Sequence, residues 1–469
     1  MLRREAHRLP PGGRLPSVRT LMARHRVSPG TVRQAMARLA DEGVLDARPG
    51  QGTFVAAAAT AHAAAEAPDF AWQASALGTG RITADDVATL LAGAPAGAVN
   101  LAGGYPAEDL QAVDLAARAL ARAARRPGVW GRVPLEGLDG LRAWFAAQLG
   151  PSVSPREVVI CPGSQAAIAT AFNALTQPGD ALIVESPSYV GALAAARVAG
   201  LRLVPVPTDA DGVVPDLLAR AFDTSGARVC YLQPLHANPT GATLAAARRA
   251  QLLDVVRSRG ALVVEDDWCR DLSFEKAPPR PLFVDDAHGH CVYLRSLTKS
   301  TAPGLRIGAI VARGAALARL TASRAVTEFF VSGPMQEAAL EVVHAPAWQR
   351  HLRRVRATLA ARRDTLVAAV RQHLGPASVT VVPSGGIHLW VRLPDAVEAD
   401  AIARRAVEAG VVVSPGRRWF PAEPTGSFLR VSYACAGDAE LRRGAETLGR
   451  LLTAGPSTRA ARSSARARR

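Results

Sequence analysis

Lysine is almost absent from this 469-residue chain. Lys276 and Lys299 are its only lysines among 56 Lys and Arg residues, so arginine supplies nearly all of the positive charge. Arginine stays protonated in proteins, whereas lysine can lose its proton and attack a carbonyl carbon to form a Schiff base. Lys276 stands in a polar loop before two prolines, as an ordinary surface residue would. Lys299 is therefore the lysine for which the sequence predicts a chemical role.

Cysteine and long apolar runs are also scarce. No C-x-x-C pair occurs among the five scattered cysteines, which favours reduced, buried thiols over a disulfide framework. There is no run of about 20 apolar residues to span a membrane, and the first residues lack the apolar stretch of a secretory signal. These absences predict a cytoplasmic protein. His288, His290 and Cys291 are close together, but no second cluster completes a metal site, so we expect no metal.

Positive charge is concentrated at the two ends of the chain. The net charge is +16, residues 1–55 hold ten arginines against four acidic residues, and residues 456–469 hold five arginines and no acidic residue. Such basic ends favour a polyanionic partner, with nucleic acid first. For the tail, a general bias toward Ala, Arg, Gly and Pro is the simpler explanation, and we expect residues 456–469 to be disordered.

Residues 1–55 carry the signals of a winged helix-turn-helix. Ser17 can cap a helix over VRTLMARHR. Ser28 and Pro29 suit the start of a second helix that ends at Gly43. Two short strands around a Pro-Gly turn then form the wing. A plain helical hairpin over residues 17–40 is the alternative.

In a winged helix-turn-helix the second helix enters the major groove with its N-terminal residues at the base edges. Residues near the first helix contact phosphates, and a glycine-rich wing can approach the minor groove. The expected DNA-binding residues are Arg14, Arg19, Ser28, Thr31, Arg33, Gly50 and Gly52.

The segments RLPSVRTLMARHRVSPGTVRQAMARLADEGVL and RPGQGTFV resemble the GntR-type DNA-binding domain. This resemblance implies double-stranded DNA as a partner. GntR-type domains begin with an additional helix, of which only MLRREAHR remains here. We therefore expect this helix to be truncated, or the start codon to lie further upstream.

Residues 56–84 read as an Ala-rich linker, and residues 85–455 as an α/β domain. The runs VVICPG, ALIVESP, LRLVPVP, RVCYLQP, ALVVEDD, CVYLRSL and IGAIVA predict strands separated by amphipathic helices. Such alternation indicates a largely parallel sheet, with ligand-binding groups at the carboxyl ends of the strands. We expect a smaller α+β C-terminal subdomain over about residues 330–455.

Candidate site residues follow these predicted strands. Lys299 is crowded by hydroxyl residues, and Arg306 comes seven residues later; hydroxyls with a guanidinium are suited to phosphate. A Schiff-base lysine beside a phosphate site is what pyridoxal 5′-phosphate requires. Asp266, at the end of a buried strand, needs a cationic partner, for which a protonated pyridine nitrogen is suited. Each signal has a plainer interpretation, such as a loop, a turn or a helix cap.

The motifs G-S-Q, P-x-Y, N-P-T-G, E-D-D and S-x-T-K-x-x-x-P-G-L-R-x-G together resemble fold-type I aminotransferases. The resemblance implies the fold of pyridoxal-phosphate-dependent transferases over residues 98–452, with Lys299 as the catalytic Schiff-base lysine. It implies that Arg430 binds a substrate α-carboxylate. The implied cofactor-binding residues are Ser164, Gln165, Tyr189, Asn238, Asp266, Trp268, Ser296, Thr298, Lys299 and Arg306.

A GntR-type winged helix ahead of such a domain is the MocR layout. It implies a transcription regulator that works as a head-to-tail homodimer, binds pyridoxal phosphate and senses an amino-acid-like effector. Two departures favour cofactor binding over turnover: Trp268 and Trp130 each stand where aminotransferases use a Tyr. The alternatives are a working aminotransferase with a degenerate DNA-binding domain, which repeated turnover with a keto acid would reveal, and a regulator that has lost the cofactor.

Overall fold

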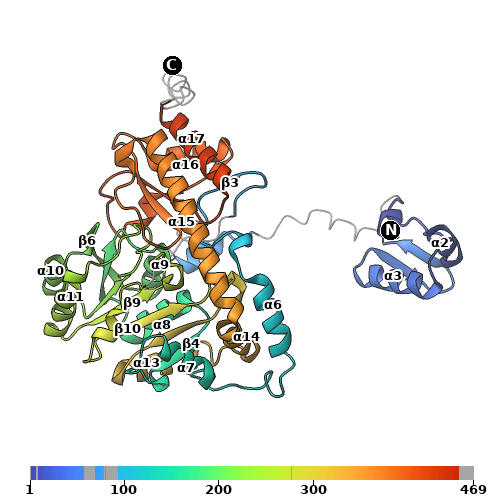
Figure 1. Cartoon of the computed structure of the whole chain (residues 1–469). Helices are drawn as coiled ribbons and strands as arrows, with labels where there is room; N and C mark the ends of the chain where they lie inside the picture. The colour runs from blue at the N-terminus through green and yellow to red at the C-terminus, as the bar shows by residue number, and fades with distance from the viewer. Residues whose placement is uncertain are drawn as a thin grey trace. The chain divides into compact units, whose positions relative to one another are not determined.

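The computed structural model describes residues 2–6, 9–56, 69–78, 80, 93–275 and 277–453. Lys276, most of the predicted linker and the basic tail lie outside these residues. The chain divides into two compact units, Met1–Gly80 and Arg81–Arg469, which are described separately (Figure 1).

The first unit has the helices and the wing that the sequence predicts. Its elements are α1 (Leu2–Ala6), α2 (Val18–His25), α3 (Pro29–Asp41), β1 (Leu45–Arg48), β2 (Gly52–Val55) and α4 (Trp72–Leu77). Ser17 and Ser28 cap α2 and α3 by accepting hydrogen bonds from the backbone N–H groups of Thr20 and Thr31, both at 3.2 Å. β1 and β2 pair antiparallel. The prediction of two capped helices and a hairpin is therefore confirmed.

The short α1 is packed into this unit. Leu2 and Ala6 are buried in the same apolar cluster as Leu21, Val32 and Leu39. On its other face, the Glu5 carboxylate accepts a hydrogen bond from Arg24 at 3.1 Å. Five residues of helix are thus enough to cover this side of the cluster.

The second unit is built on an eight-stranded sheet with the order β4-β11-β10-β9-β8-β5-β6-β7. All seven predicted strands are present. β5, β6, β8, β9 and β10 form a parallel block, while β11 is antiparallel to both of its neighbours. The bounds are β4 (Val158–Cys161), β5 (Ala181–Ser186), β6 (Arg202–Asp209), β7 (Gly212–Val213), β8 (Val229–Leu232), β9 (Leu262–Asp267), β10 (Cys291–Ser296) and β11 (Gly308–Val311).

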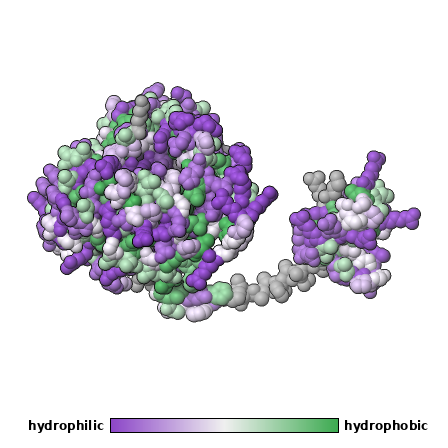
Figure 2. Space-filling view, turned by 60° about the horizontal axis from the view of Figure 1, so that its bottom comes forward, coloured by the Kyte–Doolittle hydropathy of each residue, from purple (hydrophilic) through white to green (hydrophobic). Residues whose placement is uncertain are grey.

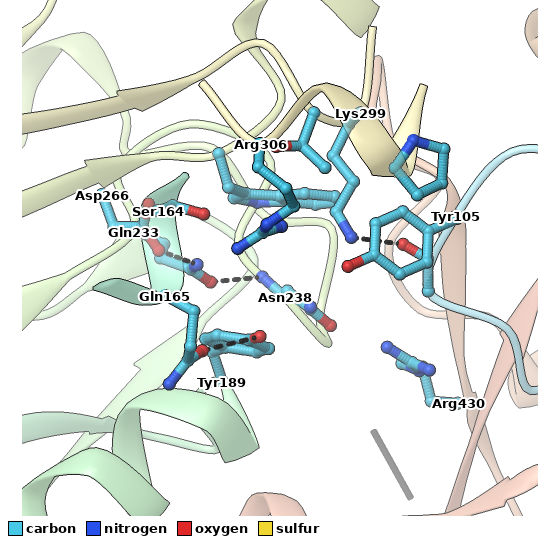
Figure 3. Close-up of a pocket in the computed structure, with 14 residues that line it drawn as sticks. Tyr105, Ser164, Gln165, Tyr189, Gln233, Asn238, Asp266, Lys299, Arg306 and Arg430 are labelled. Carbon is cyan, nitrogen blue, oxygen red and sulfur yellow. Dashed lines mark hydrogen bonds between the residues drawn. The ribbon is translucent and has the colours of Figure 1, made fainter. Parts of the chain in front are cut away.

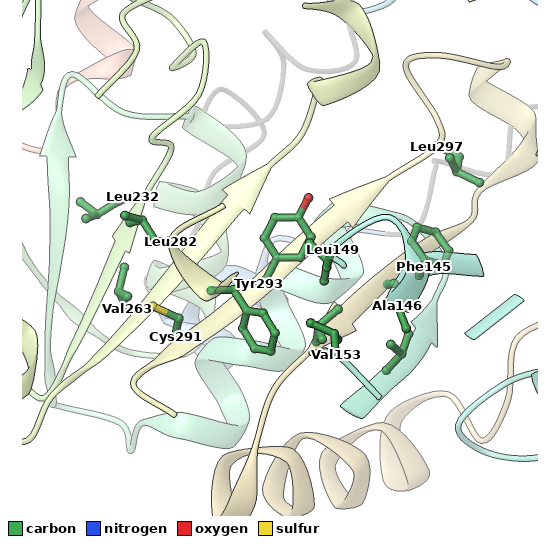
Figure 4. Packing of buried hydrophobic residues seen from close by; sticks show 14 of the residues in the cluster. Phe145, Ala146, Leu149, Val153, Leu232, Val263, Leu282, Cys291, Tyr293 and Leu297 are labelled. Atoms are coloured by element: carbon green, nitrogen blue, oxygen red, sulfur yellow. The ribbon is translucent and has the colours of Figure 1, made fainter. Parts of the chain in front are cut away.

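Helices cover both faces of this sheet, because alternate side chains of a strand point to opposite faces. Cys291 and Tyr293 of β10 join one apolar cluster (Figure 4), while Val292 and Leu294 join the other. α8 (Ser164–Leu175), α9 (Val190–Val198) and α13 (Gly314–Thr327) pack on the second face. The first face is covered by α6 (Val113–Ala123), α7 (Asp139–Ala147), α10 (Pro215–Ser225), α11 (Ala246–Ser258), α12 (Leu282–Asp285) and α14 (Gly333–His344).

A smaller lobe, which includes part of the long α15, lies beyond this sheet (Figure 1). It has its own apolar cluster, to which Val99, Leu101 and Leu110 contribute from far ahead in the chain. Its elements are β3 (Val99–Asn100), α15 (Pro346–Leu374), β12 (His388–Arg392), α16 (Ala399–Glu408), β13 (Val411–Val412), β14 (Ser414–Pro415), β15 (Phe428–Ser432) and α17 (Asp438–Thr453). The predicted start of this lobe near residue 330 stays a prediction.

Apolar side chains lie mainly inside both units. The visible face of the first unit is covered largely by hydrophilic residues (Figure 2). Among the described residues, no helix is both long and apolar enough to cross a membrane.

Leu21 tests whether the first unit depends on its small core. Leu21 is fully buried, so Leu21→Ala should lower the free energy of unfolding of this unit by about 2–5 kcal/mol. Leu77→Ala is the control, since Leu77 is 81% exposed and its loss should change that energy by less than about 0.5 kcal/mol. Differential scanning calorimetry of the full chain measures both; equal transitions for the two variants would contradict the packing described.

Candidate functional site

The carboxyl ends of the parallel strands surround a cavity of about 380 Å³ (Figure 3). The loops after β4, β8 and β10, the end of β9 and the turn before β11 meet here, because the C-terminal ends of parallel strands share one edge. The small lobe adds Arg430 from β15. The lining residues are Gly104, Tyr105, Ser164, Gln165, Tyr189, Gln233, Asn238, Asp266, Trp268, Thr298, Lys299, Pro303, Arg306 and Arg430.

Lys299 reaches into this cavity from the turn after β10. Its Nζ donates a hydrogen bond to the Gly104 carbonyl oxygen at 2.5 Å and lies 3.5 Å from the centroid of the Tyr105 ring. Burial lowers the pKa of Lys299 to about 7, and the positive charges of Arg430 and Arg306 act in the same direction. A large fraction of this amine is therefore neutral and nucleophilic near neutral pH.

Asp266 presents a carboxylate oxygen without a partner. Its Oδ2 accepts hydrogen bonds from the Tyr231 hydroxyl at 2.6 Å and from Gln233 Nε2 at 2.8 Å. Oδ1 is buried and has no hydrogen-bond partner among the described residues. Burial raises the pKa of Asp266 to about 6, against the effect of these two hydrogen bonds. A cation brought into the cavity would satisfy Oδ1 and lower that pKa.

Arg306 and the turn before α8 form a corner of the cavity that suits an anion. Arg306 has left-handed backbone (φ 48°), and its Nη2 donates to the Pro162 carbonyl oxygen at 2.9 Å. The guanidinium lies against Gly163, where a Cβ atom would stand 2.8 Å from Nη2. Ser164 opens α8, whose free N–H groups attract negative charge. This corner suits a phosphate.

Two hydroxyl residues predicted for the same corner lie at different depths. Thr298 lines the cavity. Ser296 is buried behind it, donates to Thr298 Oγ1 at 2.9 Å and is not among the lining residues. Ser296 therefore positions Thr298 rather than facing the cavity.

Arg430 occupies the opposite end of the cavity. Its Nη2 donates to the Ala102 carbonyl oxygen at 2.5 Å, and its guanidinium lies 4.4 Å from the centroid of the Trp419 ring. Nε is buried and has no hydrogen-bond partner among the described residues. A carboxylate could take that donor.

The remaining predicted residues form the walls. Tyr189 donates to Gln165 Oε1 at 3.1 Å, and Gln165 Nε2 donates to the Gly191 carbonyl oxygen at 2.8 Å, so each orients the other. Asn238 is held by its backbone N–H, which donates to Gln233 Oε1 at 2.8 Å. Trp268 lines the cavity, but its indole N–H donates to the His236 carbonyl oxygen at 3.0 Å. That donor is therefore not available to a ligand.

Four lining residues were not predicted from the sequence: Gly104, Tyr105, Gln233 and Pro303. Gln233 stands directly after β8, in the same Tyr-Leu-Gln-Pro run that led to Asn238, so the rule about strand ends could have found it. Tyr105 and Gly104 had no such signal, because only the tertiary fold brings them to Lys299. Gly104 and Lys299 are 195 residues apart in the chain.

The predicted DNA-binding residues lie in three places of the first unit: the N-terminal end of α3, the wing, and α2 with the loop before it. Ser28, Thr31 and Arg33 are exposed at the N-terminal end of α3, and Arg14 and Arg19 are exposed as well. Ser28 Oγ also caps α3, which limits its freedom to contact DNA. Arg14 reaches the wing, where its guanidinium lies against Gly52: a Cβ atom at Gly52 would stand 2.8 Å from Arg14 Nε. Gly50 has φ of 75° in the turn of the wing.

Two family models match the chain in its two units. The model for bacterial regulatory proteins of the gntR family matches residues 5–55. The model for aminotransferase class I and II matches residues 97–448. The matches agree with the helix-turn-helix and with the eight-stranded sheet.

Relatives of both kinds resemble the chain. An uncharacterized HTH-type transcriptional regulator, YdcR, from Escherichia coli is 30% identical over 94% of this chain and 95% of its own length. The 2-aminoadipate transaminase of Thermus thermophilus is 32% identical over 80% of this chain and 95% of its own length.

The fold of the second unit also resembles that of a solved aminotransferase structure. The crystal structure of LysN, an alpha-aminoadipate aminotransferase from Thermus thermophilus, matches with a TM-score of 0.74 at 32% identity, over 80% of this chain and 96% of that one. Pyridoxal 5′-phosphate is the cofactor of this fold. With a GntR domain ahead of an aminotransferase class I and II domain, the chain belongs to the MocR-type transcriptional regulators.

Proposed function

We propose that the second unit of this DNA-binding regulator holds pyridoxal 5′-phosphate on Lys299 and senses an amino-acid-like effector. One observation carries the proposal: an amine with a pKa of about 7 and a carboxylate with an unpartnered oxygen line the same cavity. The bound cofactor supplies an aldehyde that reacts with amines and a ring that accepts electrons.

The lining residues fit each part of that cofactor. Asp266 Oδ1 lacks the positive partner that a protonated pyridine nitrogen provides. Arg306, Thr298 and the start of α8 suit the phosphate. Asn238, fixed by Gln233, is the remaining polar side chain placed for the ring oxygen, since the Trp268 N–H is already used. Tyr189 and Gln165 brace each other beside it.

Residues 102–105 connect the two cationic groups that would meet the effector. Lys299 donates to the Gly104 carbonyl oxygen, and Arg430 donates to the Ala102 carbonyl oxygen. An effector whose carboxylate takes Arg430 competes with the Ala102 carbonyl oxygen, and the Lys299 amine that the exchange sets free can return to the Gly104 carbonyl oxygen. In sequence this segment follows the linker to the DNA-binding unit. We therefore propose that effector binding changes DNA binding by changing the hydrogen bonds that hold residues 102–105.

A head-to-tail homodimer and a cytoplasmic location complete the proposal. Trp130, Val326 and Phe329 are large apolar side chains that are 74%, 84% and 65% exposed, as a surface covered by a second copy would have. A regulator of this kind acts on chromosomal DNA, which accounts for the location.

The pH dependence of cofactor attachment tests the role of Lys299. Only the neutral amine attacks an aldehyde, and the lowered pKa of about 7 places the change near neutrality. The rate constant for growth of the visible absorption band after mixing with pyridoxal phosphate should rise about tenfold per pH unit below pH 7 and level off above it. Lys299→Arg should show no band, and Lys276→Arg is the matched control. A band that survives in Lys299→Arg would sink the proposal.

Hydrogen exchange tests the coupling through residues 102–105. When an equimolar mixture of L-amino acids is added to the cofactor-loaded protein, deuterium uptake in peptides that cover residues 99–107 should change, because the effector carboxylate takes Arg430 from the Ala102 carbonyl oxygen and the freed Lys299 amine can return to the Gly104 carbonyl oxygen. Peptides from β8 should not change. Arg430→Lys, which loses the planar fork, should need at least about tenfold more amino acid. Unchanged uptake over residues 99–107 with a changed absorption spectrum would reject this route.

Arg33 tests the DNA-binding surface. Arg33 is exposed at the N-terminal end of α3, while Arg38 near its C-terminal end already binds Glu42. With DNA from upstream of the protein's own gene, Arg33→Ala should weaken binding by about 1–3 kcal/mol, and Arg38→Ala should change it less. Mobility-shift titrations at one fixed salt concentration measure both. Equal losses for the two variants would argue against α3 as the recognition helix.

A further inference from the structure

The charges that line the cavity limit the class of effector. Four charged side chains are among the lining residues: Asp266, Lys299, Arg306 and Arg430. Under the proposed function, Asp266 and Arg306 face the cofactor, Lys299 exchanges with the effector nitrogen, and Arg430 takes a carboxylate. Among the described lining residues, none is then left to pair with a charge on the effector side chain.

The surfaces left to the side chain are largely apolar. Among the lining residues they include the ring of Tyr105, which lies beside Lys299 Nζ, the ring of Pro303 and the ring of Trp268. The indole N–H of Trp268 is already bound to His236, so its exposed face offers no hydrogen-bond donor. Figure 3 shows Tyr105 between Lys299 and Arg430.

Behind Arg430, outside the lining of the cavity, lie buried apolar residues. Its guanidinium stacks on Trp419, and Trp419 packs in a buried cluster with Val190, Trp390 and Phe420. A second carboxylate or an ammonium group placed beside the rings of Tyr105, Pro303 and Trp268, which line the cavity, would lose its water without gaining a charged partner, which is costly.

We infer that the effector is an α-amino acid with an uncharged, apolar side chain. This inference rests on the proposed function and specifies the ligand of the same site. The amine and the α-carboxylate are both required, since Lys299 and Arg430 recognise one each. In the exchange, the effector nitrogen would form a C=N bond to the carbon that held Nζ while the C=N bond to Nζ breaks. The two hydrogens of the neutral effector amine would pass to Nζ, and no oxidant or reductant would be needed.

A series of ligands that differ in one functional group tests the inference. L-norleucine carries an apolar side chain, L-2-aminoadipate a carboxylate, and L-lysine an ammonium group at the end of the same chain, while n-pentylamine is norleucine without its carboxylate. Each is titrated into the cofactor-loaded full-length protein while the visible absorption spectrum is recorded. The midpoint concentration for L-norleucine should be at least about tenfold lower than for the other three.

A gain of charge provides the second arm. Tyr105→Arg introduces a cation beside Lys299 and should move the preference at least about tenfold toward L-2-aminoadipate relative to L-norleucine. Val407→Arg is the matched control, because it adds the same charge at an exposed site on α16 that does not line the cavity. It should leave the order of the ligands unchanged.

The outcomes separate this inference from the function beneath it. Tighter binding of L-2-aminoadipate, L-lysine or n-pentylamine by the natural protein would overturn the inference and leave cofactor binding intact. A spectrum that forms with pyridoxal phosphate but responds to none of the four ligands would overturn it together with the sensing role. Failure to form the spectrum at all would reject the proposed function itself.

Discussion

The site depends on a buried carboxylate that lacks one partner. Asp266 stands at the end of a central strand, where Tyr231 and Gln233 bind only one of its oxygens. Leaving the other oxygen without a partner in a buried position costs free energy. A ligand that brings a positive charge to Asp266 Oδ1 offsets that cost. The unpartnered oxygen therefore favours the binding of a cationic ring.

Lys299 shows the same principle with the opposite sign. Its ammonium form is disfavoured by burial and by two nearby guanidinium groups, which lower its pKa. In a chain whose other lysine is Lys276, this position holds an amine, which unlike arginine can give up its proton. Arg306 and Arg430 thus act twice: each can bind an anionic group, and both lower the pKa of the amine between them.

The backbone of residues 102–105 lies between this chemistry and the part of the chain that leads to the DNA-binding unit. Lys299 and Arg430, the two donors proposed to meet an effector, are hydrogen-bonded to carbonyl oxygens of this one short segment. The segment continues from β3, which pairs with β13 of the small lobe. The proposed sensing route and the position of the small lobe therefore involve the same residues, and the linker precedes them in the chain.

Local patterns in the sequence were enough to predict most of the helices and strands discussed above and many of the cavity-lining residues. Helix caps at Ser17 and Ser28, the Pro-Gly turn of the wing and seven apolar strand runs are written in neighbouring residues, so the elements followed from the sequence. Because parallel strands end at one edge, the residues after them, from Ser164 to Arg306, were expected to meet. The scarcity of lysine singled out Lys299.

Tertiary structure alone decided the rest: that Tyr105 and Gly104 cover the amine, that Ser296 lies behind Thr298, and that the Trp268 N–H turns to a backbone carbonyl. These contacts join residues far apart in the chain or depend on how side chains pack, and no short sequence pattern encodes either.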